Sequence, residues 1–253
     1  MKRLWIVLPI ATACITVFNY SKTQVSKQAL RESLESCSNE RLLKMYDAGL
    51  EVLEWNHIFE EAGSHAVKEL IQENTTFHQM EHYPKGSVYD RETHAQYYYH
   101  IHRQKEHGHF HLFLRYPGVN GTDAFSHLIA ISMDDKGAPI KIFTTNRWVT
   151  GEDWAHSEDV CLMVDQFQFN RPHSSWMISK WLSSLLQFFY PQVIELIFER
   201  DLILLGDSRG RSLEEVREDK ALETLSEKEI SIDVQMEVLK AVIDKRGIEI
   251  APF

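Results

Sequence analysis

The stretch His94-Ala-Gln-Tyr-Tyr-Tyr-His-Ile-His-Arg-Gln-Lys-Glu-His-Gly-His-Phe-His-Leu-Phe-Leu-Arg115 decides the fold. In two runs along it, histidines alternate with apolar residues. Alternation at period two is typical of a half-buried strand. The first run places His94, Gln96, Tyr98, His100 and His102 on one face, and the second places His107, His109, His111, Phe113 and Arg115 on one face. The residues between the runs, 103–106, have a length common in hairpin connections. The stretch therefore predicts an antiparallel hairpin.

The expected register of this hairpin gathers its histidines. With residues 103–106 as the loop, His102 lies opposite His107, His100 opposite His109, and Tyr98 opposite His111. Directly opposed Cβ atoms are about 4.5–5.5 Å apart, so two such imidazoles can bind one metal ion. A slip of one residue would send one strand's histidines to the other face. The candidate metal ligands share one face and are His100, His102, His107, His109 and His111.

The rest of the chain predicts an α+β fold. Alternating segments at 125–133 and 139–146 continue the sheet, with His127 as a further candidate ligand on the face of Ile129 and Ile131. Residues 77–90 read as irregular, with 83–89 as a loop over the sheet that brings His78, His82 or Asp90 near the cluster. Helical periodicity fills 38–74 and most of 157–245. We expect an antiparallel four-stranded meander, about residues 93–146, flanked by N-terminal and C-terminal helices that cover one sheet face.

Composition limits the classes of partner and the domain organisation. The chain has 253 residues, 43% of them hydrophobic, and a formal net charge of −10. It is long enough for a sizeable core, and an acidic chain with no basic cluster does not suit a nucleic-acid partner. We expect an N-terminal hydrophobic leader or anchor and extension over 1–38, and a single α+β domain over 39–253.

The first residues also bear on localisation. Met1, Lys2 and Arg3 precede the apolar residues 4–18, a pattern typical of a secretory signal or a membrane anchor. If residues 1–20 act as a signal, the protein is exported or attached to a membrane through 4–18. The alternative is a cytoplasmic protein with an unprocessed leader.

The leading functional hypothesis is a transition-metal-binding protein. The cysteines Cys14, Cys37 and Cys161 form no Cys-x-x-Cys pair, so nitrogen and oxygen ligands are expected and zinc, iron and copper are all compatible. Three histidine ligands would leave a coordination position open for a small-molecule ligand, as in a metalloenzyme. Glu106 and Arg147 are the candidate catalytic helpers. Their alternative roles are a solvated loop residue for Glu106 and an intramolecular ion pair for Arg147.

Two other hypotheses remain open. The motif His107-Gly-His-Phe-His-Leu-Phe113 resembles the histidine-triad pattern of nucleotide hydrolases and transferases, with His109 as the nucleophile, although Gly108 stands where that pattern has an apolar side chain. The other is a non-catalytic binding or interaction domain whose histidines serve solubility or a response to pH.

Several longer phrases carry a resemblance to a known family. They are His94-Ala-Gln-Tyr-Tyr-Tyr-His100, Glu106-His-Gly-His-Phe-His111, Ser126-His-Leu-Ile-Ala-Ile-Ser-Met-Asp134 and Phe143-Thr-Thr-Asn-Arg-Trp-Val-Thr-Gly-Glu152. From about Asn39 to about Val242 the chain resembles a bacterial family catalogued only as a domain of unknown function. The resemblance implies no fold, reaction or ligand, and it sets residues 1–38 apart as an appended segment.

Overall fold

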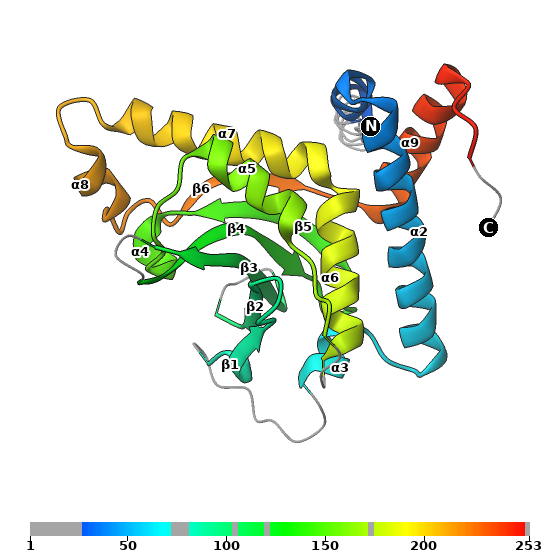
Figure 1. Cartoon of the computed structure of the whole chain (residues 1–253), viewed down its shortest axis with the longest axis horizontal. Coiled ribbons are helices and arrows are strands. Elements are labelled where there is room, and N and C mark those ends of the chain that lie inside the picture. Colours follow the sequence, from blue (N-terminus) through cyan, green and yellow to red (C-terminus); the bar gives the residue numbers. More distant parts are fainter. Residues whose placement is uncertain (1–26, 72–80, 103–105, 119–121, 172–174, 251–253) are drawn as a thin grey trace, which may run out of the picture.

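One six-stranded antiparallel sheet organises the computed structural model, which describes residues 27–71, 81–102, 106–118, 122–171 and 175–250. The strands follow chain order across the sheet (Figure 1). The α+β class is confirmed, and the predicted number of four strands is wrong because one further strand pairs at each edge. The strands are β1 (Tyr83–Tyr89), β2 (Ala95–His100), β3 (Gly108–Pro117), β4 (Asp123–Met133), β5 (Pro139–Thr145) and β6 (Thr224–Glu229).

The two edge strands were missed because they lack the alternating pattern. β1 pairs with β2 at Tyr83↔Tyr99 and Val88↔Tyr97, with a register shift between the two pairs. The segment predicted as a loop is therefore an irregular edge strand, a place where proline is tolerated. In β6, Leu225 is the one apolar residue among six. Polar edge strands limit unwanted pairing with other chains, and the same polarity hides them in the sequence.

The helices lie close to their predicted positions. Ser38 caps α2, since its hydroxyl accepts a hydrogen bond from the backbone N–H of Arg41, and Gly63 follows the helix with a positive φ of 66°. Residues 27–36 are also helical. The bounds are α2 (Asn39–Glu61), α3 (Ala66–Ile71), α4 (Arg147–Thr150), α5 (Ser157–Gln166), α6 (Trp176–Phe188), α7 (Tyr190–Asp207), α8 (Leu213–Arg217) and α9 (Ile232–Arg246).

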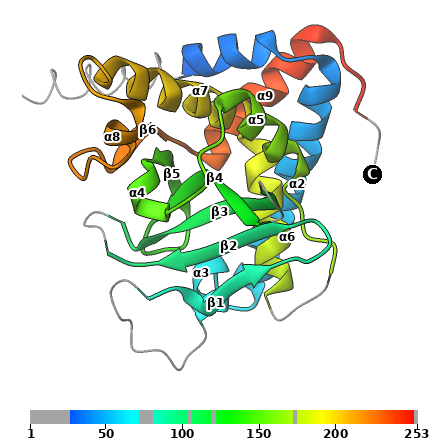
Figure 2. The ribbon, with the colours of Figure 1, turned by 60° about the vertical axis from the view of Figure 1, so that its left-hand side comes forward.

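Helices cover one face of the sheet, as predicted (Figures 1 and 2). The core between them contains Tyr97 and Tyr99 of β2, Phe110 and Leu112 of β3, and Trp181 of α6, all of them buried. Burying each such large side chain contributes about 1.5–3 kcal/mol. This packing fixes which face of β2 and β3 turns toward the helices, and the intervening residues, His100, His109 and His111 among them, occupy the opposite face.

A β-bulge changes the orientation of β4. Leu112 pairs with Ile129, yet the next residue, Phe113, pairs with His127, so Leu128 is the extra residue. Leu128 and Ile129 both belong to the helix-side core. A bulge of this kind inserts one unpaired residue and shifts the alternation beyond it. The expectation that His127 shares a face with Ile129 and Ile131 is therefore wrong, and His127 joins the histidine face.

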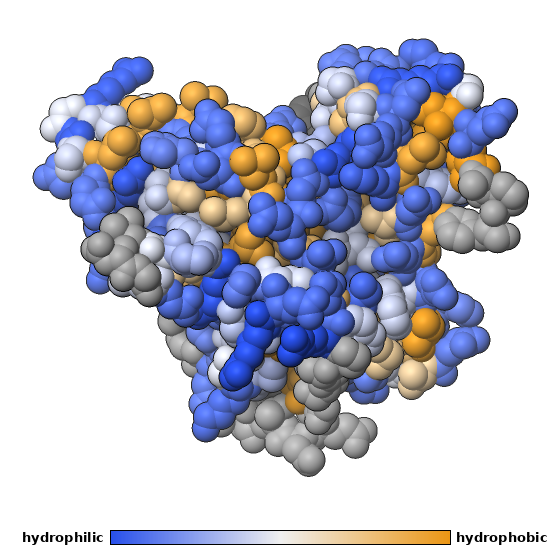
Figure 3. Space-filling model, in the orientation of Figure 1, coloured by the Kyte–Doolittle hydropathy of each residue, from blue (hydrophilic) through white to orange (hydrophobic). Residues whose placement is uncertain are grey.

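α7 carries exposed apolar side chains, Phe198, Leu202 and Leu205. Figure 3 shows orange, hydrophobic atoms gathered along this helix. Within the described parts of the chain, we find no helix that is both long enough and apolar enough to cross a membrane. Residues 1–26, which include the predicted signal or anchor, lie outside them, and so does His78. Leu34, in the helical segment 27–36, is fully buried in the core. The division at residue 38 stays a prediction.

Candidate metal centre

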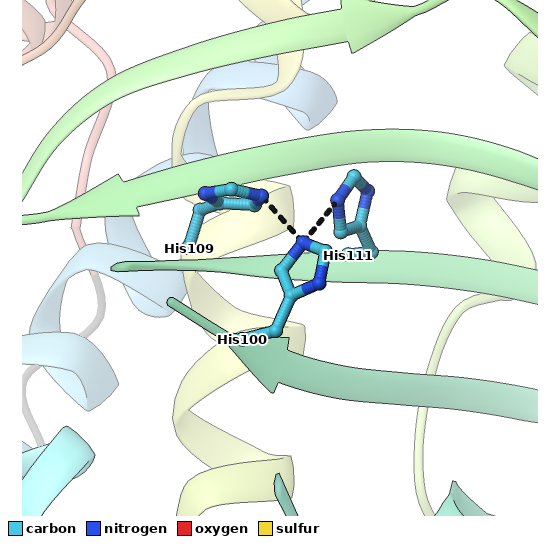
Figure 4. A group of neighbouring side chains, drawn as sticks. All are labelled: His100, His109 and His111. Atoms are coloured by element: carbon cyan, nitrogen blue, oxygen red, sulfur yellow. Dashed lines mark hydrogen bonds between the residues drawn. The ribbon is translucent and has the colours of Figure 1, made fainter. Parts of the chain in front are cut away.

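Three histidine side chains converge on the face of the sheet opposite the helices. His100 ends β2 and pairs with His109 of β3, and Tyr98 pairs with His111, so these parts of the predicted register are confirmed. The Nε2 atom of His100 lies 2.6 Å from Nε2 of His109 and 3.1 Å from Nε2 of His111. Figure 4 shows the His100 ring pointing between the other two. The three ligand atoms lie within 4.8 Å of one another, close enough to hold one metal ion.

The cluster is enclosed. His109 and His111 are 1% exposed and His100 is 7% exposed. Phe143 of β5 is buried with its ring centroid 5.3 Å from that of His109. The three rings are therefore shielded from bulk solvent.

Two of the three rings are held through their other nitrogen. Nδ1 of His109 is hydrogen-bonded to the carboxylate of Glu106, whose side chain is only 5% exposed. Nδ1 of His111 lies 2.9 Å from Nε2 of His127, and Nδ1 of His127 lies 3.4 Å from Oγ1 of Thr145. Glu106 therefore lies buried beside His109 and is not the solvated residue of the alternative interpretation, while its role as a catalytic helper stays a prediction.

The contact with Glu106 defines the tautomer of His109. A carboxylate only accepts, so the proton of neutral His109 lies on Nδ1 and the lone pair of its Nε2 faces His100. Burial lowers the pKa of His127 to about 3, which keeps that ring neutral. The Thr145 hydroxyl can either donate to Nδ1 of His127 or accept from it, and the position of the proton between His127 and Nδ1 of His111 follows from that choice.

The other predicted site residues lie in different surroundings. His102 is half-buried, with its ring centroid 4.7 Å from that of His100 and 5.0 Å from that of His109, so it borders the cluster. His107 is wrongly assigned to the histidine face, because its Nδ1 lies 2.7 Å from the hydroxyl of Tyr99, a residue of the helix-side core. Arg147 pairs through Nη2 with Glu214 at 2.5 Å and Glu218 at 2.7 Å, which ties α4 to the α8 region. Its alternative role as an ion-pair residue is the one observed.

Gly108 explains how His107 reaches Tyr99. A Cβ atom at this position would lie 2.5 Å from the Tyr99 hydroxyl, so a larger residue would displace the tyrosine. The departure from the histidine-triad pattern therefore has a packing cause. Nε2 of His109, the atom that would attack phosphorus in that pattern, lies 2.6 Å from Nε2 of His100.

Sequence reasoning assigned one residue of the site to the wrong face and missed another. His127 is a predicted candidate ligand, but its position on the histidine face depends on the bulge at Leu128, which no feature of the alternating pattern signals. Ser132 of β4 lies directly opposite His109 and was not singled out. His82 does lie near the cluster, as expected. Its ring stacks on that of Tyr98 at a centroid distance of 3.8 Å, and its ring centroid is 5.8 Å from that of His100. Asp90 instead accepts backbone hydrogen bonds from Asn170 and Arg171.

The donor set fits a first-row transition metal. Neutral imidazoles suit zinc, iron and copper, and a carboxylate on the distal nitrogen is the usual partner of a metal-bound histidine. With metal–nitrogen bonds of about 2.0–2.1 Å, tetrahedral ligands lie about 3.3 Å apart. The Nε2 atoms of His100 and His111, at 3.1 Å, nearly meet this value, whereas those of His100 and His109 must separate by several tenths of an ångström.

The fold and the histidine cluster describe an α+β protein with a candidate mononuclear metal centre. Residues 46–230 match the family described as Domain of unknown function (DUF6969). The match covers most of the chain, so the protein belongs to this family, and the resemblance found in the sequence is confirmed. No curated protein and no solved structure matches the chain.

Proposed function

We propose that this protein binds one transition-metal ion through Nε2 of His100, His109 and His111. The observation that carries the proposal is the convergence of three nitrogens. Glu106 occupies the Nδ1 side of His109, so the Nε2 lone pair of His109 points at Nε2 of His100, and Nε2 of His111 lies 3.1 Å from that same nitrogen. Lone pairs that converge in a buried site repel one another unless a proton or a cation lies between them. A metal ion satisfies all three at once.

The ligand set favours a catalytic or ligand-binding centre over a purely structural one. Structural zinc sites are closed by four protein ligands, whereas catalytic sites have three and keep one position for water or substrate. Among the described residues, the ligand atoms of His100, His109 and His111 lie within 4.8 Å of one another. His102 contacts the edge of this group and is not one of the three. Zinc, iron and copper all suit the set. Glu106 acts on the metal through His109, as a positioning residue.

Metal analysis of the full chain, purified without a histidine tag, tests the proposal. We expect close to one equivalent of metal after reconstitution, and a large loss in His100→Ala and His109→Ala. The matched control is His57→Ala, which removes a 69% exposed histidine of α2. Because histidine sites for these metals bind tightly, occupancy below about a tenth of an equivalent in the wild-type protein would refute the proposal.

A further inference from the structure

The Ser132 hydroxyl on the histidine face has no hydrogen-bond partner among the residues that the structure describes. Ser132 of β4 pairs directly with His109 of β3, and opposed residues of an antiparallel pair place their Cβ atoms on the same face about 4.5–5.5 Å apart. Ser132 is fully buried, and within the described part of the chain its hydroxyl makes no hydrogen bond. A buried hydroxyl therefore stands beside a candidate metal ligand with its hydrogen-bonding capacity unused.

Neighbouring hydroxyls of the sheet do have hydrogen-bond partners, in contrast to Ser132. On the same strand, the hydroxyl of Ser126 donates to the carbonyl oxygen of Asp153 at 2.7 Å. On β5, the hydroxyl of Thr144 lies 2.6 Å from that of Ser226. Lys141, opposite Ser132 on β5, directs its ammonium group to Glu227. Buried hydroxyls are normally hydrogen-bonded, and one left without a partner is costly.

We propose that the Ser132 hydroxyl binds the small ligand that occupies the fourth coordination position of the metal held by His100, His109 and His111. This inference rests on the proposed metal-binding function. A serine hydroxyl can both donate and accept a hydrogen bond, so it suits a metal-bound water or hydroxide as well as an anion that replaces it. The occupant is a solvent molecule or a small anion, with Ser132 as its positioning residue.

The walls of the site set the size of this occupant. Phe143 is fully buried, with its ring centroid 5.3 Å from that of His109 and 6.3 Å from that of His111. Ala130, opposite Phe143 on β4, is also fully buried. A metal-bound ligand at Ser132 therefore lies against an apolar wall, which suits water, hydroxide or a triatomic anion better than a bulky substrate.

His102 is the competing occupant of the fourth position. Its ring borders those of His100 and His109, and as a fourth ligand it would close the site. The proposal requires that His102 leave the position open. This difference is measurable because a closed site does not bind an added anion at the metal.

Azide binding to the cobalt(II)-loaded full chain tests the proposal, since cobalt(II) absorption reports a change of ligand. We expect wild-type protein to bind azide, and Ser132→Ala to weaken the affinity by about two- to tenfold, the effect of losing one hydrogen bond. His102→Ala should leave the affinity within about twofold, the variation we allow for a residue that does not touch the ligand. The matched control Ser126→Ala removes a buried hydroxyl of the same strand that has protein partners.

The outcomes separate the two proposals. If wild-type protein binds no cobalt, both fail. If cobalt binds in wild type but not in His109→Ala, yet Ser132→Ala retains wild-type azide affinity, the role of Ser132 is refuted and the metal site stands. Azide binding that appears only in His102→Ala likewise overturns the role of Ser132. Thermal unfolding of the metal-free variants checks their folding: Ser132→Ala should not be less stable than wild type, whereas Ser126→Ala should be.

Discussion

Replacing Glu106 by glutamine tests how the carboxylate acts on the metal centre. The Glu106 side chain is nearly excluded from solvent and is hydrogen-bonded to Nδ1 of His109. In this position it holds the proton of His109 on Nδ1 and makes the opposite nitrogen a better donor to metal. Glutamine keeps an oxygen that can accept from Nδ1–H, so the substitution removes the negative charge and little else.

The expected loss follows from the burial of this contact. Removing a partner of this kind costs about 10- to 100-fold in metal affinity, which corresponds to about 1.4–2.8 kcal/mol. A hydrogen bond to a charged group contributes about 1.5–3 kcal/mol, and here solvent does little to weaken it. We therefore expect Glu106→Gln to raise the zinc dissociation constant by about 10- to 100-fold. Competition with a chromophoric chelator measures this constant.

The chain offers a matched control for this substitution. Glu61 of α2 lies 3.4 Å from Nε2 of His57, and both side chains are exposed. Glu61→Gln removes the same charge from a glutamate–histidine pair outside the site, and should leave zinc affinity unchanged. The reasoning is refuted if the zinc dissociation constant of Glu106→Gln stays within twofold of wild type while His109→Ala has lost binding. The twofold limit lies well below the smallest change expected, which is roughly tenfold.

Four further predictions concern stability in the metal-free protein. Gly49→Ala in α2 should cost about 1–3 kcal/mol by overpacking, because a Cβ there would lie 2.6 Å from side-chain atoms of Phe188 and Met236. Gly206→Ala in α7, whose Cβ would meet nothing within 4 Å, should gain about 0.5–1 kcal/mol; urea unfolding measures both. Burial raises the pKa of Glu152 to about 7 from an ordinary value of 4.5. The native state thus favours the protonated acid. The resulting contribution to the free energy of unfolding is fully present below pH 4.5 and is lost as pH rises through 7. Relative to Glu152→Gln, the wild-type unfolding free energy should therefore fall by about 3 kcal/mol across this range, measured by urea unfolding at several pH values. For His127, whose pKa burial lowers from 6.5 to about 3, the sign is opposite: stability is full above 6.5 and lost as pH falls toward 3. His127→Asn should therefore flatten the acid limb of thermal stability against pH.

The hairpin register could be predicted because two local signals agree on it. The alternation in β2 and β3 fixes which residues share a face, and the length of the connection between the runs fixes which residues are opposed. The pair His100↔His109 follows from both. His102 and His107 lie beyond the paired residues of β2 and β3, so neither signal constrains them, and the Tyr99 hydroxyl determines where His107 points.

The contribution of β4 could not be predicted from the pattern. Leu128 is apolar, and an apolar residue after His127 continues an alternating strand as well as it fills a bulge. The bulge is fixed by packing, because Leu128 and Ile129 both enter the helix-side core. It turns His127 toward His111, and the two edge strands likewise acquire their structure from pairing with neighbours rather than from their own residues.

The central strands give the site its chemistry because they are paired on both sides. β2, β3 and β4 each have a neighbour on either edge, so their backbones hold His100, His109, His111 and Ser132 in fixed register without help from a loop. Such rigidity is what a metal centre needs from its first ligands and from the group beside its open position. It also carries a cost in the metal-free protein, where the close Nε2 atoms of His100 and His109 must share a proton. Metal binding removes that constraint, and for this reason affinity for metal and stability of the sheet should rise together.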